Sequence, residues 1–335
     1  MRRGKIETDA ELRCQTRSRF AAAARTPPAR ERARRKAIAA LLPLFVAALG
    51  GCEPDAYDVT RNLTYDPSIG IFGTFDLYEP EADSARTGRP AILAIHGGAW
   101  RAGDKAWGSQ IAEELCPFGY VVFSINYRLA GRTGGTWPAQ IEDVQNALKH
   151  IRTNARQYGI DPGRIASLGM SAGGHLATMV ALRDDPESPD GRVNIAVNLD
   201  GEHDMTMPPE HVMADFDDIL TAVMGHPAPW SNAELRDIST VTFARPDVSV
   251  LTVHGAGDDN VYVAQGDRIT AVLRAAGAKT EYVRLEGRNG NCHSDCWRVP
   301  EAREAIHRFL DRELAHDGDR FFEAWRGGRS ATRSR

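Results

Sequence analysis

The sequence predicts an α/β protein built on a doubly wound, mostly parallel sheet. Short, continuous apolar runs alternate along the chain with longer stretches of helical periodicity. Runs that are apolar throughout are typical of strands buried on both faces, and helices between such strands imply right-handed crossovers within one parallel sheet. The runs expected as buried strands are 91–95, 120–124 and 165–168, and further strands are expected at 194–199, 248–253 and 281–285.

The clearest expected helix begins at Trp137-Pro138 and ends before Gly159. Its apolar face consists of residues at helical spacing: Ile141, Val144, Leu148 and Ile151. Its polar side chains are expected to face water: Glu142, Asp143, Lys149 and Arg152. Further helices are expected at 109–115, 175–182, 261–276 and 301–314, and an outer strand at 71–78.

Length and charge restrict the class of protein. A chain of 335 residues is long enough to bury a substantial core, either as one large α/β domain or as two small domains. The formal net charge of −4 gives no sign of a nucleic-acid partner. We expect an N-terminal extension and signal peptide at 1–51, a linker at 52–70, the folded domain at 71–318 and a basic tail at 319–335.

The N-terminus has the pattern of an export signal. A basic stretch ending at Lys36 precedes the apolar run 37–49, which is too short to span a bilayer comfortably. The run ends in Gly50-Gly51-Cys52, which resembles a bacterial lipobox, whose cysteine becomes the lipid-modified first residue. The alternative is an ordinary signal peptide or short anchor helix with an incidental cysteine. We therefore expect an exported protein, periplasmic or on the outer membrane or cell surface, that contacts the membrane only through a lipid on Cys52.

Ser171 occupies the centre of a nucleophile-elbow pattern. The segment Gly169-Met170-Ser171-Ala172-Gly173 follows an expected strand and precedes an expected helix. In this G-x-S-x-G pattern, small neighbours permit a strained turn that projects the serine hydroxyl clear of the sheet. A Gly-rich turn between core elements is the structural alternative. Ser171 is the expected nucleophile.

A serine nucleophile needs a base, and the base needs a carboxylate that orients it. The loops after the later strands supply both, in the chain order Ser, Asp, His that doubly wound serine enzymes use. Asp258 is the expected acid, with Asp259 as the second choice, and His293 is the expected base. The remaining candidate histidines are weaker: His254 is too near the acid loop, His175 points along the elbow helix, and His203 is a candidate for the pocket wall.

Negative charge that develops on a substrate oxygen requires preorganised N–H donors, each worth about 3–4 kcal/mol. The amide of Ala172 follows the nucleophile directly and is one expected donor. The loop His96-Gly97-Gly98-Ala99-Trp100 follows a buried strand, and its glycines allow amides to turn inward. We expect Gly98 and Ala99 to donate as well, and His96 to have a structural hydrogen-bonding role.

Five segments together resemble the α/β-hydrolase esterases related to hormone-sensitive lipase, in particular bacterial carboxylesterases of the feruloyl and acetyl esterase type. These segments are HGGAWRAGDK (96–105), NYRLA (126–130), WPAQIEDV (137–144), YGIDPGRIASLGMSAGGHLA (158–177) and HGAGDDNV (254–261). The resemblance covers about residues 77–310. It implies the α/β-hydrolase fold, an acyl-serine intermediate, no cofactor, and Ser171, Asp258 and His293 as the catalytic triad.

The chain departs from this family pattern at two places. Ala99 stands where the family usually has a third glycine, and the histidine loop is longer than usual and flanked by Cys292 and Cys296. These two cysteines are close enough to form a disulfide in an oxidising compartment, which would leave Cys116 as a buried thiol. A metal site made of Cys292, His293 and Cys296 is the weaker alternative, because the sequence has no second ligand pair with zinc spacing.

The resemblance therefore implies a serine carboxylesterase that acts on small-molecule or polysaccharide-linked esters without a metal or other cofactor. One alternative is an arylformamidase or another amide or acyl hydrolase that uses the same triad, since arylformamidases have a similar His-Gly-Gly-x-Trp loop. A second alternative, from another class, is a non-catalytic binding protein that has kept the fold.

Overall fold

The computed structural model describes residues 57–80, 87–131, 134–184 and 191–314, which belong to one compact unit. The expected signal peptide at 1–51, the lipid site at Cys52 and the basic tail at 319–335 lie outside these residues. Within the described part of the chain, no helix is both long and apolar enough to cross a membrane.

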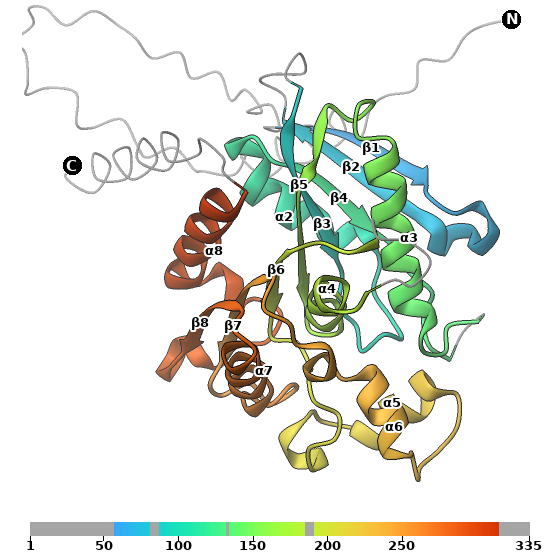
Figure 1. The fold of residues 1–335 in the computed structure, drawn as a ribbon, viewed down its shortest axis with the longest axis vertical. Coiled ribbons are helices and arrows are strands. Elements are labelled where there is room, and N and C mark those ends of the chain that lie inside the picture. Colours follow the sequence, from blue (N-terminus) through green and yellow to red (C-terminus); the bar gives the residue numbers. More distant parts are fainter. Residues whose placement is uncertain (1–56, 81–86, 132–133, 185–190, 315–335) are drawn as a thin grey trace, which may run out of the picture. The chain divides into compact units, whose positions relative to one another are not determined.

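An eight-stranded sheet forms the centre of the domain, in the order β1-β2-β4-β3-β5-β6-β7-β8 (Figure 1). The strand β2 runs antiparallel to its neighbours β1 and β4, and the remaining neighbours are parallel. The prediction of a doubly wound, mostly parallel sheet is therefore confirmed. The strands are β1 (Tyr57–Thr64), β2 (Thr74–Pro80), β3 (Arg89–Ile95), β4 (Val121–Ile125), β5 (Ile160–Met170), β6 (Ile195–Leu199), β7 (Ser249–Gly255) and β8 (Lys279–Leu285).

The N-terminal boundary of the sheet differs from the sequence prediction. The expected linker at 52–70 contains β1, and the outer strand expected at 71–78 begins only at Thr74, after a 3₁₀ helix at Pro67–Gly73. The strand β1 pairs with β2 alone and exposes most of its side chains. An edge strand of this kind needs no apolar run, so its polar sequence gave no strand signal.

Helices cover both faces of the sheet. Alternate side chains of β3 point to opposite faces, as Ile92 and Leu93 illustrate. Leu93 packs in the cluster with α3 (Ala139–Thr153), α4 (Ala172–Leu182) and α7 (Ala264–Ala275), whereas Ile92 packs with α2 (Gly108–Leu115) and α8 (Pro300–Glu313) (Figure 1). Two short helices that the sequence analysis did not predict, α5 (Phe216–Met224) and α6 (Asn232–Ile238), follow β6.

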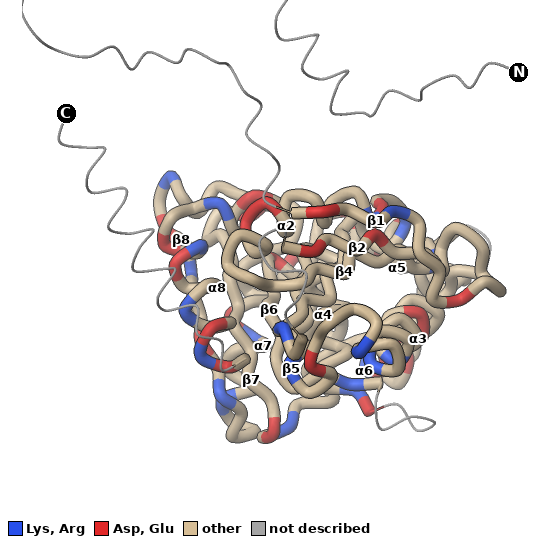
Figure 2. Tube along the Cα trace, turned by 90° about the horizontal axis from the view of Figure 1, so that it is seen from above, with Lys and Arg blue, Asp and Glu red and all other residues tan. Residues whose placement is uncertain are grey.

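Lysine and arginine residues are interspersed with aspartate and glutamate residues along the described trace (Figure 2). Asp143 is the exception on α3: the sequence analysis expected it to face water, but its side chain is buried. The backbone N–H of Arg128 donates to Asp143 Oδ2 at 2.7 Å, and the Arg128 guanidinium donates to Asp143 Oδ1 at 2.7 Å. Asp143 therefore anchors the loop after β4 to α3. Helical periodicity alone cannot indicate its burial, because the partner, Arg128, comes from a different segment of the chain.

Candidate active site

Ser171 lies in a strained turn between β5 and α4, with φ 54° and ψ −126°. Two close backbone approaches hold this turn in place. A Cβ added to Gly169 would lie 2.1 Å from the carbonyl oxygen of Gly173, and one added to Gly173 would lie 2.1 Å from the carbonyl oxygen of Ile95. Only glycine fits at either position, which explains the spacing of the elbow pattern in physical terms.

Asp258 and His293 meet at the carboxyl end of β7. His293 Nδ1 lies 2.7 Å from Asp258 Oδ2, so the protonated Nδ1 donates to the carboxylate and Nε2 remains available to a substrate or nucleophile. The other oxygen, Asp258 Oδ1, accepts from the backbone N–H groups of Asn260 at 2.9 Å and Val261 at 3.1 Å. Asp259, the second choice for the acid, is exposed and makes no contact with His293 among the described residues.

The order of the strands explains why these groups share one edge of the sheet. The strands β5, β6, β7 and β8 are consecutive parallel neighbours. Ser171 follows β5, Asp258 follows β7 and His293 follows β8, so all three lie at the carboxyl edge where open α/β sheets form their active sites. The N–H of Ser171 donates to the carbonyl of Leu199 at 2.7 Å, which ties the turn to β6.

Carboxyl groups around His293 favour its protonated form. Burial opposes the charged imidazole, but the hydrogen bond from His293 to Asp258 and the charge of Asp258 outweigh it and raise the pKa of His293, and Asp200 and Glu202 in their ionised forms add smaller contributions. Asp200 and Glu202 were not among the residues that the sequence analysis selected. Asp200 directly follows the buried strand β6, so the reasoning that identified Asp258 after β7 could also have found it.

A disulfide encloses the candidate base. Cys292 and Cys296 form this disulfide, as the sequence predicted, with their Cα atoms 5.2 Å apart. Cys292 directly precedes His293, and Cys296 is fully buried. The alternative metal site at these residues is therefore wrong, because disulfide sulfurs are not thiolate ligands. Cys116 is buried and free, and burial raises the pKa of its thiol.

The loop after β3 presents unpaired amides next to the elbow. Gly98, Ala99 and Trp100 all have positive φ angles, of 114°, 50° and 55°. Within the described residues, neither Gly98 nor Ala99 donates its N–H to another group of the protein. A Cβ added to Gly97 would lie 3.3 Å from the Cβ of Ser171, so this loop passes directly beside the nucleophile.

Ala172 is the first residue of α4 and directly follows Ser171. The N–H of His175 donates to the carbonyl of Ser171 at 3.0 Å, which is the first hydrogen bond of α4. The amides before it, including that of Ala172, have no partner within the helix. The three donors expected from the sequence, Gly98, Ala99 and Ala172, therefore lie in segments that flank Ser171, with their N–H groups available to a ligand.

The other buried histidines have structural partners. His96 Nδ1 contacts the carbonyl of Gly97 at 2.8 Å, the His96 ring stacks on Tyr127, and burial lowers the pKa of His96 to about 4. His175 contacts the carbonyl of Ile238 at 2.6 Å, and burial lowers its pKa to about 4. His203, which the sequence analysis proposed for the pocket wall, is fully buried against Thr240. Each of these rings is thus held neutral, in keeping with a structural role.

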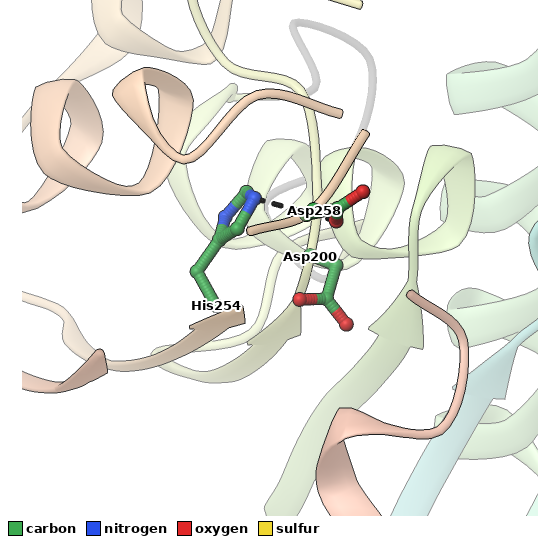
Figure 3. A group of neighbouring side chains, drawn as sticks. All are labelled: Asp200, His254 and Asp258. Carbon is green, nitrogen blue, oxygen red and sulfur yellow. Dashed lines mark ion pairs between the residues drawn. The ribbon is translucent and has the colours of Figure 1, made fainter. Parts of the chain in front are cut away.

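Three neighbouring buried side chains have the composition of a metal site: Asp200, His254 and Asp258 each place one ligand atom within 4.8 Å of the others (Figure 3). Their existing bonds do not suit a cation. His254 Nε2 donates to the carbonyl of Val261 at 2.9 Å, and Asp258 already accepts from two amides and from His293. The three side chains instead form a cluster of titratable groups next to the candidate base, in which His254 Nε2 lies 3.6 Å from Asp258 Oδ2 and each side chain has a backbone hydrogen-bond partner.

The sheet order, the strained serine turn after β5 and the Asp–His pair after β7 and β8 define the α/β-hydrolase class. The chain belongs to the BD-FAE family, whose model matches residues 75–273. This confirms the resemblance to feruloyl-type esterases. His293 lies beyond the matched residues, in the loop that departs from the family pattern.

Several similar proteins are esterases by name. The chain is 33% identical over 223 residues to a probable carboxylic ester hydrolase, LipM, of Mycobacterium tuberculosis, covering 62% of this chain and 51% of that protein. It is 32% identical over 240 residues to the esterase LipQ of the same organism, covering 66% of this chain and 54% of that protein. The chain thus spans about half the length of these curated relatives.

Two solved structures share the fold over nearly their whole length. A truncated carbohydrate esterase from gut microbiota has a TM-score of 0.67 and 26% identity, covering 78% of this chain and 98% of that chain. A thermophilic esterase of Thermogutta terrifontis, with a TM-score of 0.62 and 22% identity, covers 77% of this chain and 92% of that chain. The second likeness concerns the fold alone.

Proposed function

We propose that the protein is a serine carboxylesterase that hydrolyses carboxylic esters through an acyl-serine intermediate. The observation that carries this proposal is the 2.7 Å contact between His293 Nδ1 and Asp258 Oδ2, at the same sheet edge as the strained Ser171. The names of the relatives support ester hydrolysis, and the likeness to a carbohydrate esterase supports small-molecule or polysaccharide-linked esters as substrates.

In the first half-reaction, Ser171 Oγ attacks the carbonyl carbon of the ester while its proton passes to His293 Nε2. The amides of Gly98, Ala99 and Ala172 stabilise the oxyanion that forms on the carbonyl oxygen. The tetrahedral intermediate collapses, its carbon–oxygen bond breaks, and the departing alcohol takes the proton from His293. Asp258 holds the imidazole in the required tautomer and stabilises its protonated form.

In the second half-reaction, a water molecule attacks the acyl-serine. His293 accepts one proton from this water, a second oxyanion forms at the same amides, and its collapse releases the carboxylic acid and returns the proton to Ser171 Oγ. Both half-reactions use only protons that the Ser171 hydroxyl and the water supply.

Hydrolysis of short-chain p-nitrophenyl esters tests the proposal, with Ser171→Ala and His293→Ala as variants. We expect wild-type turnover, and a loss of about 10⁴-fold or more in each variant. An N-formyl arylamine assayed in parallel distinguishes an arylformamidase, which would favour the amide. An inert wild type, or a Ser171→Ala variant with full activity, would contradict the proposal in favour of a binding protein.

We also propose that the protein is exported and anchored by a lipid on Cys52. The support is the basic stretch, the short apolar run and the Gly50-Gly51-Cys52 sequence. Metabolic labelling with a palmitate analogue in a bacterial host tests this: we expect label on the wild type and none on Cys52→Ser.

A further inference from the structure

Asp200 is a buried carboxyl group fixed beside the acid of the proposed triad. Its N–H donates to the carbonyl of Val253 in β7 at 2.9 Å, and Asp200 Oδ1 accepts from the N–H of Gly255 at 3.2 Å. Both bonds cross to β7, which leads into the Asp258 loop. Asp200 also has a positive φ of 51°, an uncommon conformation for a residue other than glycine.

The surroundings of Asp200 are those of one partner in a pair of carboxyl groups. The residue is fully buried, and Asp200 Oδ2 has no hydrogen-bond partner among the described residues. One of its oxygens lies within 4.8 Å of an oxygen of Asp258 (Figure 3). Burial and the charge of Asp258 raise the pKa of Asp200 to about 8. Asp200 therefore holds its proton more readily than an ordinary carboxyl group does.

The relation between these two groups is reciprocal. Because the charge of Asp258 helps to keep Asp200 protonated, removing that charge makes it easier for Asp200 to lose its proton to solvent. The charge of Asp200 also acts on His293 and favours its protonated form. A negative charge on Asp200 would therefore stabilise the protonated imidazole of His293, as the charge on Asp258 does, but to a smaller extent.

We propose that Asp200 is a reserve acid for His293, a positioning residue that ionises and stabilises the protonated imidazole when Asp258 bears no charge. The proposal rests on the proposed esterase function. It predicts that the contributions of Asp200 and Asp258 to activity are not independent, because each carboxyl group can partly replace the other.

Other charged groups face the same imidazole. Glu202 is buried and acts on His293, but its carboxylate accepts its own backbone N–H and it is not in the group of close ligand atoms. His254 donates to Val261 and is held neutral, because burial lowers its pKa. The charge of Asp295 acts on Asp200 only as a minor influence. Asp200 is therefore the carboxyl group best placed to replace Asp258.

A double-mutant cycle of Asp258→Asn and Asp200→Asn tests the proposal, with kcat/KM for p-nitrophenyl acetate as the readout. We expect Asp258→Asn alone to lose about 10- to 100-fold, instead of the roughly 10⁴-fold loss seen when a triad carboxylate has no substitute. In the Asp258→Asn background, Asp200→Asn should lower kcat/KM by about a further 100-fold, whereas in the wild type it should lower kcat/KM by less than about 10-fold. Asp259→Asn, the exposed neighbour, is the matched control and should change kcat/KM in neither background.

Equal losses from Asp200→Asn in the two backgrounds would overturn the proposal. The proposal would also be overturned if, in the Asp258→Asn background, Glu202→Gln lowered kcat/KM further and Asp200→Asn did not. Inactivity of the wild type towards p-nitrophenyl acetate, or full activity of Ser171→Ala, would instead refute the esterase function itself. Asp258→Ser, with folding checked by circular dichroism, serves as a second uncharged background.

The pH profile supplies a readout that a merely structural role would not change. The charge of Asp200 raises the pKa of His293, so the acid limb of kcat/KM should lie at lower pH in the double variant than in Asp258→Asn. Coincident acid limbs in the two variants would show that Asp200 does not ionise beside His293, and would overturn the proposal.

Discussion

Gly173→Ala is expected to damage both the stability and the chemistry of the domain. The new Cβ would lie 2.1 Å from the carbonyl oxygen of Ile95 and 2.6 Å from that of His96. Both atoms belong to the buried end of β3 and its loop, so no side-chain rotation can relieve the contact. Either α4 or the loop must move by about 1 Å, because ordinary carbon–oxygen contacts lie near 3.4 Å.

The expected cost in the free energy of unfolding is about 2–4 kcal/mol, the range for overpacking against backbone that cannot relax. For a domain of this size, that corresponds to a decrease of roughly 4–16 °C in melting temperature. The loop displaced by the new Cβ also carries the amides of Gly98 and Ala99. A shift of about 1 Å in such donors costs about 100-fold in kcat.

Differential scanning calorimetry and ester hydrolysis measure the two effects on the same preparation. Gly163→Ala is the matched control, because the nearest atom to its new Cβ is a side-chain oxygen of Asp161 at 3.3 Å. We expect its melting temperature to stay within about 2 °C of the wild type. A Gly173→Ala variant as stable and as active as Gly163→Ala would refute the reasoning from the close approach.

Three further predictions follow from the described contacts. Replacing Cys292 and Cys296 by serine should lower kcat/KM about 10-fold or more by loosening the loop of His293, and circular dichroism of the folded variant checks that the domain persists. The pKa of Asp200 rises from 3.8 to about 8 on folding, so its contribution to stability is lost as pH rises through this window. The free energy of unfolding, measured with denaturant, should therefore decrease less between pH 5 and pH 8 in Asp200→Asn than in the wild type. Replacing Asp143 by alanine should cost about 3 kcal/mol in the same measurement, because it removes the buried carboxylate of the pair and leaves the partly buried Arg128 guanidinium with only the exposed Glu142, at 3.3 Å.

The sequence predicted the parallel part of the fold because its signal is local. A buried parallel strand is apolar along most of its length, and β3, β4, β6, β7 and the second half of β5 follow from such runs. The strand β8 is only partly buried, and its sequence mixes charged and apolar residues. The edge strand β1 escaped the analysis because its exposed residues follow no apolar pattern. Asp143 escaped it for a different reason: its burial depends on Arg128, which reaches α3 from another segment.

The same distinction applies to the site. Ser171, Asp258 and His293 stand in motifs or directly after strands, so chain order alone brings them to the carboxyl edge of the sheet. Asp200 has an equivalent place after β6, but its importance depends on its distance from Asp258, which only the packing of β6 against β7 determines. The disulfide was predicted because its two cysteines are close along the chain. Its relevance to catalysis comes from its position, since the two cysteines flank His293.

Backbone strain is concentrated where the chemistry is proposed to occur. Among the described residues, five of the seven non-glycine residues with positive φ lie at this edge: Ala99, Trp100, Ser171, Asp200 and Ser294. Such conformations cost about 1–3 kcal/mol each and persist only where the surrounding structure enforces them. Here the enforcing structure is the parallel sheet, whose buried strands fix the start of every loop. A rigid sheet that holds strained loops can keep amides, serine and imidazole in place before the substrate arrives, which reduces the reorganisation needed during reaction.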